Sequence, residues 1–490
     1  MMGYIDKSIL QIHEAMKKGE VTPEALVAES AKRIAADSSN AFEKTLLDQA
    51  AEQAASLTSF EEGNPLYGIP YVAKDNFSTK GIETTASSNV LNGYVPLFDA
   101  TVVKKLADRK CVMMGKSTLD ELAMGGTGTT GHKGITYNPY DPSHERMVGG
   151  SSCGSAASMA DGEAVFALGS DTGDSVRKPA SLAGLVGFKP TWGRISRYGL
   201  FPFAPSLDHV GYFTRYVSDA AVLLNALAGY DEMDFTSSTK PVEDYLSEIN
   251  NPLSGRRFAV IKEIIDSIDD PVMKGKFNAL SEALRKQGAV VEEVEFGEEL
   301  LRSIYATYIV ISCAEATSND ANLDGIKFGP YYGGKSYQEV MKNARTKGFS
   351  ELIKRRFIIG SFALMRENQE DLFLRAQRNR AKIVERTLSF LSHYDAYLVP
   401  AAPSIAPKFA SSSDKLSSEY LIADNHLALG NFAGLPSITV PLGFEDGMLL
   451  GVNLMSEAFS EKLLLNLANK VEEITGLGGV SHVNRKEGNL

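Results

Sequence analysis

The chain is poor in residues that often bind metals or form cross-links. It has three cysteines among 490 residues, Cys111, Cys153 and Cys313, and no Cys-x-x-Cys pair. This usage is typical of a reducing compartment such as the cytoplasm and argues against a structural zinc site. The seven histidines lack the i, i+4 spacing of a helical metal pair, so we expect no metal ion in this chain.

Long apolar runs and a basic surface charge are also missing. No stretch of 18 apolar residues occurs and the first 20 residues do not resemble a signal peptide, so we expect a cytoplasmic chain without a membrane anchor. The net charge of -11 argues against direct binding of this chain to the phosphate backbone of a nucleic acid. With 43% hydrophobic and 23% charged residues, the composition is that of an ordinary globular protein.

Strand-like and helix-like segments alternate along the chain. Short apolar runs predict strands at Tyr71–Lys74 and at Ala164–Leu168, and helical spacing predicts a helix over 42–57 and mostly helix over 299–395. This alternation favours an α/β fold with a parallel or mixed sheet. The serine-rich segment 411–419 is expected to be a mobile loop.

Three short motifs lie within residues 150–178, and each fails a test of context. Asp171-Thr172-Gly173 resembles the aspartic protease loop, but the second such loop is missing. Residues 150–154, Gly-Ser-Ser-Cys-Gly, fit a nucleophile elbow, but a polar segment precedes them where a strand is required. Residues 175–178 fit Ser-x-x-Lys, but the companion Ser-Asp-Asn and Lys-Thr-Gly elements are absent.

A lysine and two serine loops remain as a chemical group. A nucleophilic serine needs a base, and a buried lysine can be one because burial favours its neutral form. Ser151 could then relay a proton from Ser175 to Lys74, since one helix and one strand join the two serine loops. The backbone N–H groups of residues 172–175, which are Thr172, Gly173, Asp174 and Ser175, would stabilise an oxyanion. A solvated lysine and two ordinary connecting loops would have the same sequence pattern. The residues alone are therefore compatible with a Ser–Ser–Lys hydrolase but do not require one.

The run "GGSSCGSAASMADGEAVFALGSDTGDSVRKPASLAGLVGFKPTWGRISRYGL" resembles the amidase signature family. The resemblance implies the α/β amidase signature fold, a large mixed β-sheet core surrounded by α-helices. It also implies one amidase domain over 1–490, with a catalytic core at about 65–215 and a helical insertion at about 299–395. The family's Lys–cis-Ser–Ser triad falls on Lys74, Ser151 and Ser175, and acts through an acyl-enzyme without metal or organic cofactor.

Further stretches, including "GIPYVAKDNFSTKGIETTASS" and "SLDHVGYFTR", extend the likeness over about 65–455. Within the family they are most similar to the glutaminase subunits of tRNA-dependent amidotransferases. That likeness implies a heterotrimer with B and C subunits, in which ammonia from glutamine passes to B. The B subunit would use ATP and Mg to amidate Glu-tRNA or Asp-tRNA, and would make most contacts with the charged tRNA.

The same resemblance assigns the binding of glutamine to Tyr308, Arg356 and Asp424. Chemistry agrees with the last two, because a guanidinium suits an α-carboxylate and a carboxylate suits an α-ammonium. Without the resemblance, Arg356 and Asp424 would equally well be surface charges, and Tyr308 a core residue.

One departure from the family lies beside the nucleophile. The family usually has Gly-Gly-Ser-Ile-Arg-Gln, whereas residues 173–178 are Gly-Asp-Ser-Val-Arg-Lys. If Asp174 needs a positive φ, the side chain costs about 1 kcal/mol. A carboxylate about 4 Å from the oxyanion would add about 4 kcal/mol of repulsion, unless Lys178 pairs with it. Two alternatives therefore stay open: a stand-alone amidase for another small amide, and a catalytically weakened family member.

Overall fold

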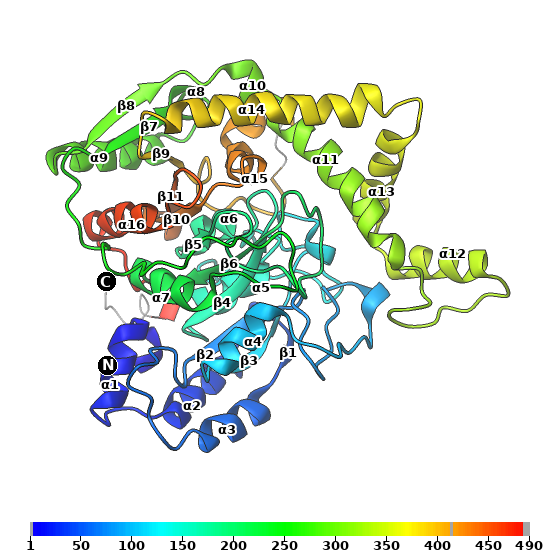
Figure 1. Cartoon of the computed structure of the whole chain (residues 1–490), viewed down its shortest axis with the longest axis horizontal. Coiled ribbons are helices and arrows are strands. Elements are labelled where there is room, and N and C mark those ends of the chain that lie inside the picture. The colour runs from blue at the N-terminus through cyan, green and yellow to red at the C-terminus, as the bar shows by residue number, and fades with distance from the viewer. Residues whose placement is uncertain (1–2, 412–414, 484–490) are drawn as a thin grey trace.

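The computed structural model describes residues 3–411 and 415–483 (Figure 1). Residues 412–414 of the expected mobile loop lie outside the described part. Eleven strands form one sheet in the order β1-β3-β2-β4-β6-β5-β10-β11-β9-β7-β8. The strands are β1 (Phe42–Thr45), β2 (Pro70–Lys74), β3 (Val112–Ser117), β4 (Phe166–Asp171), β5 (Val186–Lys189), β6 (His209–Thr214), β7 (Arg257–Ile261), β8 (Val290–Val294), β9 (Ala396–Pro400), β10 (Ser437–Glu445) and β11 (Met448–Met455).

The sheet mixes parallel and antiparallel pairs. β2 is parallel to both β3 and β4, and β7 is parallel to both β8 and β9. The middle of the sheet, from β4 through β6, β5, β10 and β11 to β9, is antiparallel. The predicted α/β fold with a mixed sheet is therefore confirmed.

Helices surround the sheet (Figure 1). They are α1 (Ile9–Lys17), α2 (Pro23–Ile34), α3 (Leu47–Ser56), α4 (Thr101–Asp108), α5 (Cys153–Ala160), α6 (Arg177–Ala183), α7 (Val217–Leu227), α8 (Lys262–Asp266), α9 (Pro271–Lys286), α10 (Glu298–Arg302), α11 (Ile304–Asn319), α12 (Tyr337–Gly348), α13 (Glu351–Leu364), α14 (Arg375–Leu391), α15 (Leu429–Phe432) and α16 (Glu461–Thr475). None of the described helices is long and apolar enough to cross a bilayer.

Two predictions about local structure are wrong in part. The helix expected over 42–57 begins only at Leu47, because residues 42–45 form the edge strand β1 on β3. The strand expected at Ala164–Leu168 lies two to three residues later, at Phe166–Asp171. Its polar end was predicted as loop, but Ser170 and Asp171 pair with β6, so tertiary pairing overrides the local preference of polar residues for loops.

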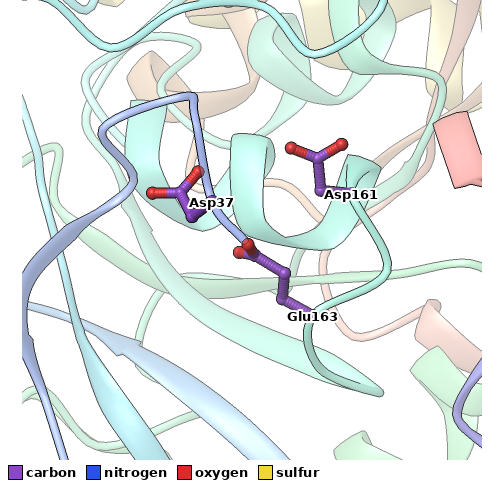
Figure 2. A group of neighbouring side chains, drawn as sticks. All are labelled: Asp37, Asp161 and Glu163. Carbon is purple, nitrogen blue, oxygen red and sulfur yellow. The ribbon is translucent and has the colours of Figure 1, made fainter. Parts of the chain in front are cut away.

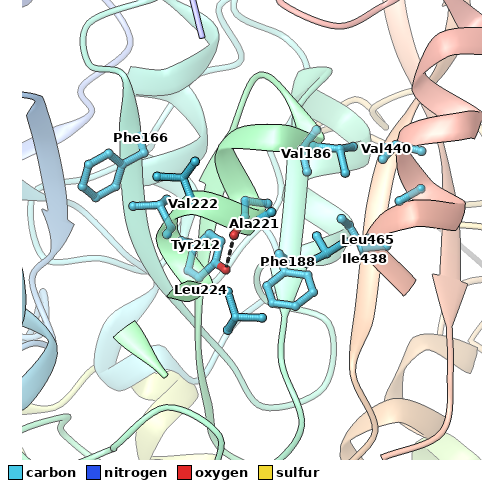
Figure 3. Packing of buried hydrophobic residues seen from close by; sticks show 14 of the residues in the cluster. Phe166, Val186, Phe188, Tyr212, Ala221, Val222, Leu224, Ile438, Val440 and Leu465 are labelled. Carbon is cyan, nitrogen blue, oxygen red and sulfur yellow. Dashed lines mark hydrogen bonds between the residues drawn. The ribbon is translucent and has the colours of Figure 1, made fainter. Parts of the chain in front are cut away.

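The central core lies between the sheet and helices α7 and α16. Figure 3 shows Phe166, Phe188 and Tyr212 of the sheet against Val222 and Leu224 of α7. The Tyr212 hydroxyl donates to the Ala220 carbonyl at 2.8 Å, which satisfies its polar group inside the core. This core packs against the middle of the sheet, and the candidate site lies at the carboxyl end of β4.

The helices of region 298–391 form a separate layer. α11 and α13 pack side by side and extend away from the sheet, with α12 at their far end and α14 running back along the body (Figure 1). The prediction that 299–395 is mostly helical is confirmed. α11 and α13 carry Tyr308 and Arg356, so this layer brings remote side chains towards the site.

The parallel pair β2–β4 positions the first catalytic candidates. Ala73 lies opposite Leu168, so Lys74 at the carboxyl end of β2 stands beside residues 169–170 of β4. Carboxyl ends of adjacent parallel strands meet at one edge of the sheet, where α/β proteins usually bind ligands. The loop after β4 carries Ser175, and the loop before α5 carries Ser151.

Candidate active site

Lys74 is fully buried and surrounded by hydroxyl groups. Its Nζ lies 2.8 Å from Ser151 Oγ, 2.9 Å from Ser152 Oγ and 2.9 Å from Ser170 Oγ. Among the described residues no carboxylate forms an ion pair with it. Burial lowers the pKa of Lys74 to about 7, so the amine is available in its neutral form near neutral pH.

The hydrogen bonds around Lys74 fit a neutral amine with two hydrogens and one lone pair. Ser152 donates its hydroxyl to the Ser170 carbonyl at 3.2 Å, so its oxygen accepts from Lys74. Ser170 Oγ accepts from Asn76 Nδ2 at 2.9 Å and can accept the second amine hydrogen. The lone pair is then left for the Ser151 hydroxyl. Lys74 is thus arranged to take a proton from Ser151.

Ser175 lies next to this group and is 4% exposed. Its carbonyl accepts from the Ser152 N–H at 3.3 Å, which ties the two serine loops together. The peptide bond between Gly150 and Ser151 is cis. In the described chain no hydrogen bond joins the Ser175 and Ser151 hydroxyls. The contact expected between Lys74 and Ser151 is therefore formed, and the one expected between Ser151 and Ser175 is not.

The loop before Ser175 leaves its backbone donors free. The N–H groups of residues 172–175, the expected oxyanion donors, make no hydrogen bond within the part of the chain described. Asp174 does not have a positive φ, so the backbone cost considered for this substitution does not arise. A Cβ on Gly173 would lie 3.0 Å from the Tyr308 ring, so glycine lets this tyrosine pack closely on the loop.

A buried ion pair between Asp171 and Arg177 supports the loop of residues 172–175. Arg177 Nη2 donates to Asp171 Oδ1 at 2.9 Å and Arg177 Nε to Asp171 Oδ2 at 3.1 Å. Asn431 donates to the same carboxylate at 2.9 Å, and the Val176 N–H does so at 3.0 Å. Although burial opposes it, the Arg177 guanidinium holds the pKa of Asp171 well below its usual range. Asp171 therefore holds the loop that carries Ser175 as a permanent anion.

Tyr308 and Arg356 reach this loop from the helical layer. Burial raises the pKa of Tyr308, while the charge of Arg356 lowers it and that of Asp174 raises it, so all three lie in one electrostatic neighbourhood. Arg356 Nε and Nη1 are buried and have no hydrogen-bond partner among the described residues. Unpaired buried guanidinium donors are costly, and a carboxylate ligand would satisfy them.

Asp424, the third residue assigned to the substrate, is already paired. Lys178 Nζ lies 2.6 Å from Asp424 Oδ1 and donates to the Asp424 carbonyl at 3.0 Å. The same amine lies 3.7 Å from Asp174 Oδ2. The pairing expected between Lys178 and Asp174 is therefore present, but the closer partner is Asp424.

The residues that support Lys74 and Asp171 from inside carry no clear signal in the sequence. Ser152, Ser170 and Asn76 contact Lys74 directly or through one hydroxyl, and Arg177 and Asn431 hold Asp171. Asn431 lies 260 residues from Asp171 in the chain, and no local pattern marks such a contact. Of these supporting residues, only Ser152 could have been suspected from the sequence, because it directly follows Ser151 in the "GSS" loop.

Three carboxylates meet elsewhere, at the start of β4 (Figure 2). Oxygens of Asp37, Asp161 and Glu163 lie within 4.8 Å of one another. Asp161 pairs with His482 at 3.1 Å, and Asp37 accepts the Ser39 and Ala41 N–H groups. The length of β4, about 20 Å at 3.3 Å per residue, separates this cluster from the Ser175 loop. We assign it no part in the chemistry there.

The chain is similar to a known protein family over most of its length. The model of the family described as Amidase matches residues 25–465. The chain is 37% identical to the A subunit of the Glutamyl-tRNA(Gln) amidotransferase of Exiguobacterium sp. strain AT1b, over 97% of this chain and 98% of that protein. It is 42% identical to the protein of the same name from Thermotoga maritima, over 85% of this chain and 86% of the relative.

Solved structures agree. The crystal structure of the A subunit of the Glutamyl-tRNA(Gln) amidotransferase from Thermotoga maritima superposes with a TM-score of 0.79 at 36% identity, covering 96% of each chain. The peptide amidase PAM bound to the competitive inhibitor chymostatin gives a TM-score of 0.80 at 27% identity, covering 97% of this chain and 99% of that one. These matches confirm the predicted amidase signature fold, and the chain belongs to the amidase family.

Proposed function

We propose that this chain hydrolyses glutamine to glutamate and ammonia through an acyl-enzyme on Ser175, as the glutaminase subunit of a tRNA-dependent amidotransferase. The observation that carries the chemistry is Lys74, a buried amine whose closest partners are hydroxyls and whose pKa is lowered to about 7. The amide class follows from relatives that span nearly the whole chain and are named as amidotransferase subunits.

In the first step Ser175 Oγ attacks the carbonyl carbon of the side-chain amide. The serine proton passes to Ser151 as the Ser151 proton passes to Lys74, so one hydroxyl relays it and Lys74 becomes an ammonium. The negative charge on the carbonyl oxygen is stabilised by the free N–H groups of residues 172–175.

In the second step the carbon–nitrogen bond breaks and ammonia leaves. The proton on Lys74 returns through Ser151 to the leaving nitrogen, which leaves an ester on Ser175. Water then attacks this ester and gives a proton through Ser151 to Lys74. As the ester bond breaks, Lys74 returns this proton through Ser151 to Ser175 Oγ, and glutamate and the free serine are released. Lys74 thus acts as base and acid in turn.

The substrate would be oriented by charge at both ends. The unpaired donors of Arg356 suit the α-carboxylate, and Tyr308 would pack beside it against the oxyanion loop. The α-ammonium needs a carboxylate on the other side, and Asp424 is the residue proposed for it.

We also propose the partners that the relatives' names suggest. A B subunit would take the ammonia, use ATP and Mg to amidate Glu-tRNA or Asp-tRNA, and contact the charged tRNA, while a C subunit completes the heterotrimer. The assembled enzyme would be a cytoplasmic carbon–nitrogen ligase with glutamine as amido donor. This chain, as one amidase domain over 1–490, would need no cofactor of its own.

A second candidate is a stand-alone amidase for another small amide. The ion pair between Lys178 and Asp424 favours it, because a substrate without an α-ammonium would leave this pair intact. Turnover of an amide panel in the absence of partner subunits would distinguish this candidate.

The test of the main proposal is glutamine hydrolysis by the purified chain, alone and copurified with B and C subunits from the same source. We expect ammonia release that the partners stimulate, complete loss in Ser175→Ala, and amidation of Glu-tRNA or Asp-tRNA only in the full complex. Labelling of Ser175 by an acylating probe without glutamine turnover in the complex would contradict the proposal.

A further inference from the structure

Lys178 lies between two carboxylates at the edge of the site. Its Nζ is 2.6 Å from Asp424 and 3.7 Å from Asp174, the residue directly before the nucleophile Ser175. The side chains of Lys178, Asp174 and Asp424 are 16%, 25% and 27% exposed, so a ligand can reach them. The single ammonium group of Lys178 is therefore shared between two carboxylates.

Other carboxylates near the site are already engaged. Asp171 is paired with Arg177. Asp208 accepts the Thr172 hydroxyl and two backbone N–H groups. Asp120 accepts the N–H groups of residues 127–130. Asp174 and Asp424 are the carboxylates beside the Ser175 loop that could meet an α-ammonium, and both lie near Lys178.

Resting on the proposed glutamine substrate, we propose that Lys178 is an internal counter-ion that leaves Asp424 for Asp174 when an α-amino acid amide binds. In the free chain Lys178 holds the place of the substrate ammonium. On binding, the ammonium takes over Asp424 and Lys178 turns to Asp174, which lies four residues earlier, just before α6. A lysine has a flexible four-carbon stem, and i, i+4 pairs are neighbours on a helix.

The exchange links binding to catalysis. Asp174 directly precedes Ser175 and belongs to the proposed oxyanion loop, so an unpaired carboxylate there would repel the developing charge. Burial raises the pKa of Asp174 to about 6, against the effect of Lys178, so at neutral pH most Asp174 side chains are charged. Full pairing with Lys178 would cancel this repulsion at the moment when substrate is bound. An amide without an α-ammonium would leave Lys178 on Asp424 and Asp174 less well paired.

The experiment compares binding in an inactive background. In Ser175→Ala we would measure by calorimetry the dissociation constants of glutamine and of glutaramate, which has the same amide and carboxylate but no amino group. Asp174→Gly, Lys178→Gln and the double variant complete the set. Circular dichroism and thermal unfolding check that each variant folds.

The exchange predicts a pattern specific to glutamine. Asp174→Gly should weaken glutamine binding at least tenfold, because Lys178 loses its second partner and keeps Asp424. Lys178→Gln should bind glutamine as tightly as the parent or more tightly, and the double variant should restore the binding lost in Asp174→Gly. Glutaramate should change less than threefold throughout. In the active chain Lys178→Gln should lower kcat at least tenfold while KM stays the same or falls.

Other results would overturn the inference. Additive losses in the double variant, equal effects on glutaramate, or no binding of glutamine by any variant would each do so. The proposed function fails separately: if glutamine binds with the expected pattern but the active complex releases no ammonia, the exchange stands and the glutaminase assignment does not.

Discussion

Two lysines near Ser175 have opposite environments. Lys74 is fully buried among three hydroxyls, and burial lowers its pKa to about 7. Lys178 is partly exposed and contacts two carboxylates. Although burial opposes it, Asp424 and then Asp174 raise the pKa of Lys178.

The difference shows that the partners of a lysine decide its chemistry. Hydroxyl groups satisfy the amine without stabilising its charge, so Lys74 can be neutral and accept a proton. Carboxylates stabilise the charge, so Lys178 is a permanent cation suited to pairing. The following predictions test this contrast.

The largest effect is expected from removing Lys74, the proposed base. Lys74→Met should lower kcat by at least about 10³-fold, because losing one member of a catalytic group disables the whole group. Glutamine hydrolysis and labelling of Ser175 by an acylating probe would measure it. Lys178→Met is the matched control and should still be labelled; equal loss of labelling in both variants would remove the contrast.

A carboxylate partner should raise the pKa of Lys74, as Asp424 and Asp174 raise that of Lys178. In Ser170→Asp the new carboxylate would stand near Nζ, which is now 2.9 Å from Ser170 Oγ, and would stabilise the charged amine. We expect activity at pH 7 to fall about 5- to 50-fold if the pKa of Lys74 rises from about 7 by one to two units, with recovery at higher pH. Ser170→Asn controls for size, and a loss in Ser170→Asn that matches Ser170→Asp at every pH would contradict the electrostatic cause.

The unmodified chain should show the titration of Lys74 directly. The neutral amine is the active form, so kcat/KM should fall about tenfold per pH unit below about pH 7 and level off above it. A rate profile from pH 5.5 to 9 measures this, with thermal unfolding at each pH as the check on folding. A flat profile between pH 5.5 and 7.5 would rule out Lys74 as the base.

The smallest effects concern stability. Lys74→Met takes a hydrogen-bond partner from the buried hydroxyls of Ser151, Ser152 and Ser170, so it should lower the free energy of unfolding by about 1–3 kcal/mol. Lys178→Met should lower it by at most about 1 kcal/mol, since its pairs are partly exposed. Denaturant titration measures both, and a loss of about 4 kcal/mol or more in Lys74→Met would indicate that Lys74 is charged and paired in the folded chain.

Much of the site could be predicted from the chain because its motifs are local. The apolar run predicts a strand that ends at Lys74, and the helix and strand between the two glycine- and serine-rich loops predict that Ser151 and Ser175 can come together. Those segments fold as expected, with β2 ending at Lys74 and α5 following the first serine loop. The boundary of β4 was missed because its polar end is held by pairing with β6.

By itself the sequence determined the α/β alternation, the order of the reactive residues and the glycine-containing loop before Ser175. Only the tertiary structure decided the charge states. The β2–β4 register surrounds Lys74 with hydroxyls, and a contact across 246 residues places Lys178 on Asp424. The physical reason is that a pKa depends on burial and on neighbours within a few ångströms, and those neighbours come from segments far apart in the chain.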